Sequence, residues 1–343
     1  MIAATEPRQR PPDARLLVVD ALGRMRHTAR RDFVNLLRAG DVVIANDAAT
    51  LPASLVGHHL PTRGAIEVRL AGRRSLDDVE SFSAVVFGAG DFHTPTERRP
   101  APPLLSPGDR LALGPLRATV TEMLGHPRLA LLHFDGSADD IWAGIARHGR
   151  PIQYAHMSTP LSLWDVWTVI AGPPVAFEPP SAGFVLDWEA LATLRRRGVE
   201  FATITHAAGI SSTGDPELDG HLPFDEPYDI PTATACTINR ALADGRRIVA
   251  IGTTVVRALE HAASIRGATV TAGPGVATQR INETSQLQIV DAIISGVHEP
   301  ATSHFQLLRA FADRTTLETA DAAMTAGGYR THEFGDSVWF ERR

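Results

Sequence analysis

The sequence contains no lysine, so all 33 of its basic residues are arginines. A lysine amine forms Schiff bases, anchors pyridoxal phosphate and contacts the phosphates in P-loops, so all these mechanisms are excluded. Proton transfer must therefore use His, Asp, Glu, Tyr or the single cysteine, Cys236. One cysteine cannot form an internal disulfide or a cysteine-based metal site, and a reducing cytoplasm is the simplest expectation.

Long apolar runs are also missing. No run reaches the roughly 18 residues that a transmembrane helix needs. The polar segment 1–12 lacks the apolar stretch of a secretory signal, so we expect no membrane association. The net charge of −6 argues against a broad nucleic-acid surface, although it is compatible with a local arginine patch. The 343 residues, 44% of them hydrophobic, are enough for roughly two packed domains.

One stretch combines a buried strand with a polar turn. Ile248–Ile251 is a short β-branched run of the kind that buried strands use. Gly252 interrupts it, and Thr253 or Thr254 is predicted to cap a helix that runs to about Ala263. Backbone N–H groups and two hydroxyls would then point to one place, which favours a carboxylate, a ribose or a phosphate. A capped helix after a core strand, with no ligand, is the alternative interpretation.

The rest of the chain shows two patterns of predicted secondary structure. Strands are predicted at 15–20, 41–45 and 199–204, alternating with helices at 139–148, 187–197 and 232–243, which indicates an α/β layer. Between about 63 and 136, short alternating segments separated by Gly and Pro turns are typical of an antiparallel barrel or sandwich. His58 and His59 are interpreted as solvent-facing loop residues. The expected fold is an α/β body with an inserted small antiparallel β-barrel, divided into 1–62 with 138–343, and 63–137.

Short motifs occur along the chain in a characteristic order and spacing. They are Pro180-Ser-Ala-Gly183, Gly252-Thr-Thr-Val-Val-Arg-Ala-Leu-Glu260, His298-Glu-Pro300 and Phe334-Gly-Asp336. Together they resemble the S-adenosylmethionine:tRNA ribosyltransferase-isomerases of queuosine biosynthesis, which have Pro-Thr-Ala-Gly, Gly-Thr-Thr-x-x-Arg-x-Leu-Glu, His-x-Pro and Tyr-Gly-Asp. The resemblance runs from near residue 7 to the C-terminus, and it implies the same α/β body with an inserted barrel.

Several positions depart from the family pattern. Val185 and Phe224 stand where the family has histidines, and Ala49 and Ser54 stand where it has arginines. The family's Ser-Thr-Leu after His-x-Pro becomes Thr-Ser-His, ending in His304. These changes remove acid, base and phosphate-contact capacity, so they indicate a divergent paralogue with an altered substrate or altered later steps.

The resemblance implies S-adenosylmethionine as a co-substrate. In the family reaction, the amine of 7-aminomethyl-7-deazaguanine in tRNA takes the ribosyl carbons, and adenine and methionine leave. This chemistry needs a base for the 5′ proton but no metal, and no metal-ligand cluster is visible in the sequence. Three functions remain open: the tRNA reaction, use of the same donor with a small-molecule or nucleoside acceptor, and non-catalytic binding. The acidic charge, the absent lysines and the lost arginines favour the second, with tRNA possible.

The candidate site residues follow from the motifs. Each has a plain structural alternative: a hydrogen-bonded histidine, a solvated turn carboxylate or a turn residue. The oligomeric state is not indicated. The candidate catalytic residues are His206, His298, Glu226 and Asp336, and the candidate S-adenosylmethionine-binding residues are Asn46, Asp47, Ser181, Ala182, Gly183, Gly252, Thr253, Thr254, Arg257 and Glu260.

Overall fold

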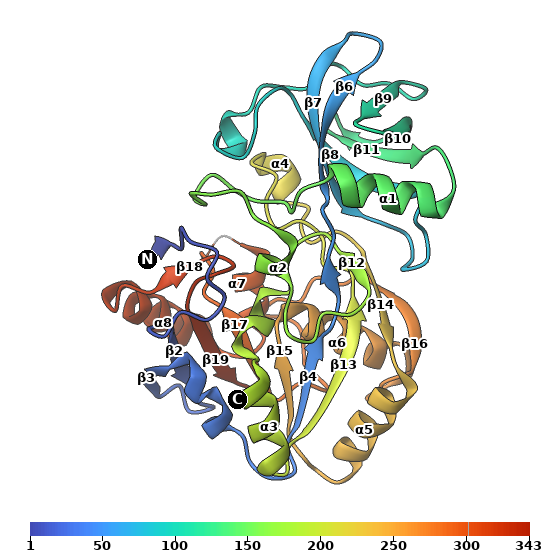
Figure 1. Ribbon diagram of the computed structural model, residues 1–343. Coiled ribbons are helices and arrows are strands. Elements are labelled where there is room, and N and C mark those ends of the chain that lie inside the picture. The colour runs from blue at the N-terminus through green and yellow to red at the C-terminus, as the bar shows by residue number, and fades with distance from the viewer. Residues whose placement is uncertain (301) are drawn as a thin grey trace.

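The computed structural model describes residues 1–300 and 302–343. It confirms the predicted fold class, because an α/β body carries a small antiparallel β-barrel at one end (Figure 1). The barrel strands are β6 (Ser54–His59), β7 (Gly64–Gly72), β8 (Ser81–Phe87), β9 (Arg110–Leu113), β10 (Leu116–His126) and β11 (Leu129–Phe134). They close in the order β10-β11-β8-β7-β6-β9. A closed barrel leaves no exposed strand edge.

Alternating side chains fill the barrel. In β10, Leu116, Ala118 and Val120 are buried in the barrel core, and Arg117 between them is exposed. Gly57 allows β6 to meet β9 closely, because a Cβ atom there would lie 2.0 Å from the carbonyl oxygen of Ala112. Strand β6 precedes the predicted insertion of 63–137, and the division of the chain into two domains at those boundaries stays a prediction.

The interpretation of His59 as a solvent-facing loop residue is wrong. His59 lies in β6 and is only 1% exposed. Its Nδ1 lies 2.9 Å from the hydroxyl of Thr62, and its Nε2 lies 3.0 Å from a carboxylate oxygen of Asp109. These two partners satisfy both ring nitrogens, which allows a polar side chain to be buried in the barrel wall.

The body is built on one mixed sheet. Its strands are β2 (Arg15–Val19), β3 (Met25–Ala29), β4 (Val42–Asn46), β13 (Glu200–His206), β14 (Glu226–Ile230), β15 (Ile248–Ile251), β16 (Gly273–Ala277), β17 (Ala292–Gly296) and β19 (Ser337–Glu341). The order across the sheet is β16-β14-β13-β4-β15-β17-β19-β2-β3. The central strands β13, β4, β15 and β17 are parallel, so their carboxyl ends meet at one edge.

Both faces of the sheet are covered, and the alternation within β4 shows how. Val42 and Ile44 belong to the core on one face, with residues of α5, α6 and α8, whereas Val43 and Ala45 belong to the opposite core, with η1 and α3. The longer helices are α1 (Ala138–His148), α3 (Trp188–Arg196), α5 (Thr232–Ala243), α6 (Thr253–Arg266) and α8 (Arg314–Ala326). The shorter ones are α2 (Leu163–Val166), α4 (Pro216–Asp219), α7 (Ser303–Leu308), η1 (Arg30–Leu36), η2 (Thr96–Arg98) and η3 (Ser181–Val185).

Two short parallel pairs complete the structure. Strand β1 (Ile2–Ala3) pairs with β18 (Arg330–Thr331), and β5 (Ala49–Thr50) pairs with β12 (Pro174–Ala176). Within the described ranges, no helix is both long enough and apolar enough to cross a membrane.

The start of α6 differs from the sequence expectation. The N-cap is Gly252, with a φ of 97°, and no side chain caps the helix. The prediction that Thr253 or Thr254 caps it is therefore wrong, because the left-handed backbone of Gly252 carries both threonines into the first helical turn. Strand β15, in contrast, has the predicted bounds of Ile248–Ile251.

The side chain of Glu260 attaches α6 to the segment 288–290. Its carboxylate accepts hydrogen bonds from the backbone N–H groups of Gln288, Ile289 and Val290, at 2.7, 3.0 and 2.9 Å. We expect Glu260→Ala to lower the free energy of unfolding by about 2–3 kcal/mol, because buried donors lose their partner. Glu260→Gln, which keeps one acceptor oxygen, should cost about half as much. Urea denaturation measures both, and equal costs for the two variants would contradict this role.

Candidate active site

The carboxyl ends of the four parallel strands define the candidate site. Strand β4 ends at Asn46, β13 at His206, β15 at Ile251 and β17 at Gly296. In open α/β sheets, this edge is where ligands bind. Among the candidate residues, Asn46 and His206 end two of these strands, and Asp47, Thr253, Thr254 and His298 follow shortly after a strand end.

A small cavity lies against the turn after β15. Gly252 faces η3, and a Cβ atom added to it would lie 3.3 Å from the Cβ atom of Ala182. The cavity has a volume of about 60 Å³. Its walls include Ser181, Ala182, Thr253, Thr254, His298 and His304.

A larger crevice adjoins this cavity. The two share Glu178, Ser181, His298 and His304, so they lie next to each other. The crevice has a volume of about 520 Å³, within the roughly 300–1,000 Å³ typical of small-molecule sites. Its further walls include Tyr154, His156, His332 and Glu333, together with Glu97 from the barrel side.

Glu178 is the carboxylate best suited to proton transfer. Burial raises its pKa, as does the negative charge of Glu333, and hydrogen bonds offset part of this shift, so that its pKa is about 7. The Tyr154 hydroxyl donates to one oxygen of Glu178, and the Ser211 N–H donates to the other at 3.0 Å. A buried carboxyl that titrates near neutral pH can accept or donate a proton, which is what general acid–base catalysis requires.

Two histidines that line the same crevice as Glu178 stack on each other. The ring centroids of His298 and His304 are 4.3 Å apart, and their planes differ by 13°. Burial and the neighbouring imidazole hold the pKa of His298 well below its ordinary value, and burial also lowers the pKa of His304. Both rings are therefore neutral near pH 7, and each offers one donor and one acceptor nitrogen.

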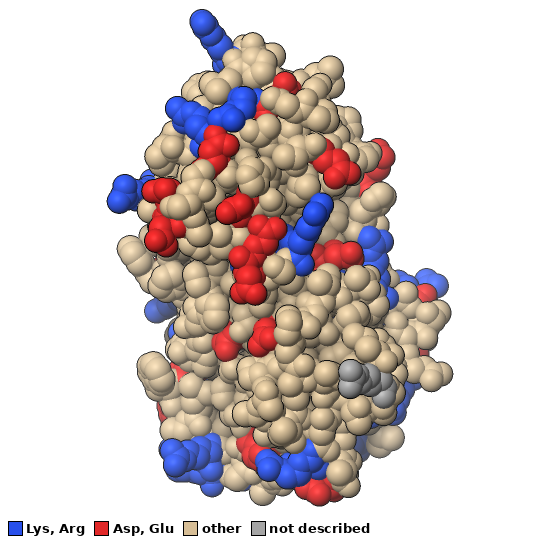
Figure 2. Space-filling view, turned by 90° about the vertical axis from the view of Figure 1, so that its right-hand side faces the viewer, with Lys and Arg blue, Asp and Glu red and all other residues tan. Residues whose placement is uncertain are grey.

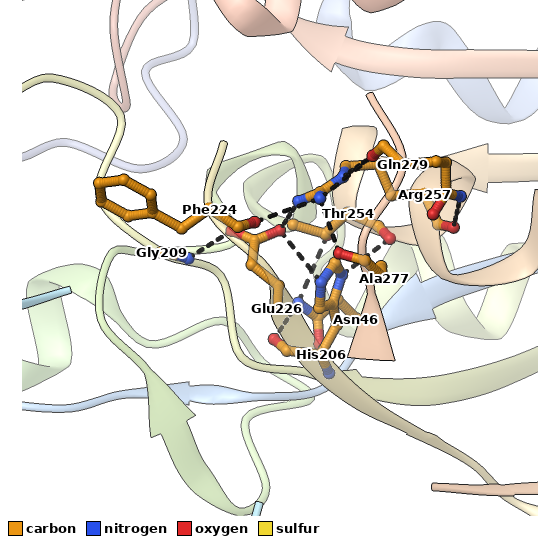
Figure 3. Close-up of polar contacts among 9 residues, drawn as sticks. All are labelled: Asn46, His206, Gly209, Phe224, Glu226, Thr254, Arg257, Ala277 and Gln279. Atoms are coloured by element: carbon orange, nitrogen blue, oxygen red, sulfur yellow. Dashed lines mark hydrogen bonds and ion pairs between the residues drawn. The ribbon is translucent and has the colours of Figure 1, made fainter. Parts of the chain in front are cut away.

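Behind the crevice wall, a buried polar network ties the strand ends together (Figure 3). The Asn46 side chain donates to the carbonyl of His206 at 2.9 Å and accepts from the His206 N–H at 2.9 Å. The fully buried ring of His206 donates through Nδ1 to the carbonyl of Thr254 at 2.8 Å. Strands β4 and β13 are thereby linked to the first turn of α6.

The network continues through an ion pair. Nε2 of His206 lies 3.2 Å from a carboxylate oxygen of Glu226, which also pairs with Arg257. The Arg257 guanidinium further donates to the carbonyls of Ala277 and Phe224, at 2.9 and 3.2 Å. Burial raises the pKa of Glu226, but Arg257 and His206 outweigh it and bring the pKa to about 2. Arg257 and Glu226 thus satisfy each other inside the protein.

Four other candidate residues make contacts within the protein, three of them through their side chains and Gly183 through close packing. Asp47 accepts from the hydroxyls of Thr203 and Thr205, both at 2.7 Å. Gly183 packs against Thr168, and Glu260 binds the backbone described above. Asp336, 1% exposed, accepts from the N–H groups of Arg15 and Arg330, both at 2.8 Å. The catalytic or ligand-binding roles of these residues stay predictions, and their geometry shows structural contacts.

Several groups in the crevice were not among the residues predicted from the sequence. Glu178 and Tyr154 contact each other but are 24 residues apart in the chain. Glu178 lies two residues before Pro180-Ser-Ala-Gly183, so its proximity to that motif was the available signal. His156, His332 and Glu333 also converge, with one potential ligand atom of each within 4.8 Å of the others. Imidazole and carboxylate are side-chain types that bind metal ions, and the sequence had shown no such cluster.

The depressed pKa of Glu226 predicts a specific acid sensitivity. Because this pKa is about 2 when folded and 4.5 ordinarily, the stabilisation is fully present above about pH 4.5 and is lost as the pH falls towards 2. The difference in unfolding free energy between the wild type and Glu226→Gln should therefore shrink by on the order of 3 kcal/mol between pH 6 and pH 2. Urea denaturation across this range measures it, with the exposed Glu217→Gln as the control. A difference independent of pH would contradict the assignment.

Comparisons with known proteins agree with this architecture. The chain is 34% identical over 336 residues to the S-adenosylmethionine:tRNA ribosyltransferase-isomerase of Thermus thermophilus, covering 95% of this chain and 92% of that relative. It is 33% identical over 360 residues to the protein of the same name from Sorangium cellulosum, covering 98% and 94%. The crystal structure of an S-adenosylmethionine tRNA ribosyltransferase from Thermotoga maritima has the same fold, with a TM-score of 0.52 and 22% identity over 98% of this chain and 96% of that chain.

A model of one protein family extends over nearly the whole sequence. It is described as queuosine biosynthesis protein, and it matches residues 1–340. The curated relatives named above are enzymes and are similar to this chain over more than nine-tenths of its length. The chain therefore belongs to the queuosine biosynthesis protein family of S-adenosylmethionine:tRNA ribosyltransferase-isomerases.

Proposed function

We propose that this protein transfers and isomerises the ribosyl group of S-adenosylmethionine onto a base in tRNA, in the cytoplasm. The observation that carries the proposal is the position of Glu178, a buried carboxyl with a pKa of about 7, in a crevice at the carboxyl ends of the parallel strands. The family membership over residues 1–340 supplies the reaction class.

The crevice and the adjoining cavity fit a sulfonium nucleoside. Their combined space is large enough for one, and the lining offers hydroxyls, neutral imidazoles and carboxylates. Neutral His298 and His304 place no positive charge beside a cationic ligand. S-adenosylmethionine supplies the ribosyl carbons and a sulfonium that acidifies the adjacent 5′ carbon.

Glu178 would accept that proton. Its ionised form is hydrogen-bonded by Tyr154 and Ser211, which fixes the direction of the carboxylate. The pKa of Tyr154 is raised well above its ordinary value by burial and by Glu178, so the hydroxyl stays protonated and remains a donor. A base with a pKa near the working pH combines a large ionised fraction with useful basicity.

The remaining crevice groups would orient the nucleoside. His298 and His304 each offer one N–H and one lone pair. These groups are suited to holding a proton at an adenine nitrogen while adenine leaves. The hydroxyls of Ser181, Thr253 and Thr254 line the small cavity and suit ribose hydroxyls or a carboxylate. His206, Glu226 and Arg257 would act as positioning residues, because they hold the carbonyl of Thr254 rather than face the crevice.

We propose tRNA as the acceptor, because the relatives with the same full-length match carry tRNA in their names. This reverses the preference for a small-molecule acceptor that charge and the lost arginines had favoured. A free amine-bearing small molecule, either a base or a nucleoside, is the second candidate. It is supported by Ala49 and Ser54, which replace family arginines, and by the face in Figure 2, where arginines are interspersed with acidic groups rather than gathered in a band.

The decisive experiment supplies the enzyme with S-adenosylmethionine and one acceptor at a time. The acceptors are tRNA that carries 7-aminomethyl-7-deazaguanine, the same tRNA with guanine, and the free 7-aminomethyl-7-deazaguanine base. We expect adenine and methionine in equal amounts with the modified tRNA, with a rate that falls as salt rises, because phosphate contacts are screened. Release with only the free base would support the second candidate. No release with any acceptor would overturn the proposal.

Glu178→Gln tests the assignment of the base. We expect kcat to fall by about 100–10,000-fold, because a positioned base contributes this much. The rise of kcat with pH through about 7 should also disappear, since it reports ionisation of Glu178. Glu217→Gln, an exposed glutamate outside the crevice and the cavity, is the control and should keep both rate and profile. A variant at position 178 with the wild-type pH profile would eliminate Glu178 as the base.

A further inference from the structure

A second pair of histidines lies in the same crevice, next to a carboxylate. The rings of His156 and His332 are stacked, with centroids 4.3 Å apart and planes at 14°. Nε2 of His156 lies 3.6 Å from an oxygen of Glu333. All three residues line the crevice and come from segments about 180 residues apart. In the part of the chain that the structure describes, no other trio of His, Cys, Asp or Glu side chains brings its ligand atoms within such reach.

We propose that His156, His332 and Glu333 bind one divalent transition-metal ion. Two imidazole nitrogens and one carboxylate oxygen form the donor set of many zinc sites with three protein ligands, and also of non-haem iron sites. Such a set leaves a coordination position open. Because the three residues line the crevice, that position would face the space where substrate enters.

The contacts among the three side chains are incomplete without such an ion. Nε2 of His156 is buried and has no hydrogen-bond partner. At 3.6 Å, its separation from the Glu333 oxygen is too long for a hydrogen bond. Buried polar atoms are normally satisfied, and a cation between the two groups would satisfy both at once. Donor atoms around a tetrahedral zinc are about 3.3 Å apart. Each imidazole lone pair lies in the plane of its ring, so at least one of the two stacked rings must turn out of the stack for both to reach one ion.

The backbone holds the turn that carries His332 and Glu333 in a defined conformation. His332 adopts a left-handed conformation, with a φ of 69°, and its carbonyl accepts from the N–H of Gly335 at 3.0 Å. A side chain on Gly335 would collide with the carbonyl of Arg330, because its Cβ atom would lie 2.4 Å from that oxygen. Asp336 anchors the end of the turn through its bonds to two backbone N–H groups. A rigid turn lowers the ordering cost of binding, which favours a preorganised site.

Direct metal titration tests the inference without any turnover. Tag-free protein is stripped with EDTA, titrated with Co²⁺ and followed by visible absorption, and Zn²⁺ retained after dialysis is counted by elemental analysis. We expect one equivalent of either metal. His156→Ala, His332→Ala and Glu333→Gln should each weaken binding by more than about 100-fold, since even the loss of an outer partner of a metal ligand costs about 10–100-fold.

His126→Ala is the matched control, because Nε2 of His126 also lies near a carboxylate, 3.4 Å from Asp215, but outside this trio. It should bind metal as the wild type does. Should an alanine variant fail to fold, as judged by circular dichroism, the nearly isosteric Glu333→Gln decides the question. The proposal is overturned if the wild type binds no stoichiometric metal, or if Glu333→Gln binds it with unchanged affinity. Either outcome leaves the proposed ribosyl transfer untouched, because burial is the largest cause of the raised pKa of Glu178, whereas a bound cation would offset the contribution of Glu333 to it.

Discussion

The ion pair between Arg257 and Glu226 constrains the whole candidate site. It joins α6 to β14, and through His206 it reaches β13 and the first turn of α6. A buried pair of this kind adds little net stability over a well-packed apolar pair, but breaking it leaves a buried charge without a partner. Its value is geometric, because the guanidinium and the carboxylate fit together in one arrangement of the strand ends. The turn at Gly252 therefore has a defined position relative to the crevice.

Two buried glutamates show how the surroundings assign different tasks to one side chain. Glu226 faces Arg257 and is ionised at any physiological pH, so it cannot exchange protons there. Glu178 has hydrogen-bond donors but no cation beside it, and the negative charge of Glu333 acts against its ionisation. In the proposed reaction, Glu178 is therefore the group suited to exchange a proton, and Glu226 is suited to hold the strand ends.

Local pattern predicted much of the fold and only part of the site. The strand Ile248–Ile251 was found because its apolar run is a property of neighbouring residues. The burial of His59 was not predicted, because it depends on a contact with Asp109, 50 residues further along the chain. Glu226 was selected as a candidate catalytic residue and Arg257 as a candidate S-adenosylmethionine-binding residue, yet nothing in the sequence indicated that they would bind each other across 31 residues. His156, His332 and Glu333 come together only because two loops that are distant in the sequence lie side by side. The spacing of motifs along the chain does not indicate such a contact.

The position of β19 in the sheet has a consequence for the newly made chain. This strand lies between β17 and β2, so the hairpin of β2 and β3 reaches the rest of the sheet only through it. Arg15 of β2 accordingly binds Asp336, 321 residues later. During synthesis, the first hairpin must wait at the ribosome, unpaired on one side, until almost every other residue has emerged. Contacts of such long range slow folding and leave an open strand edge for chaperones to shield.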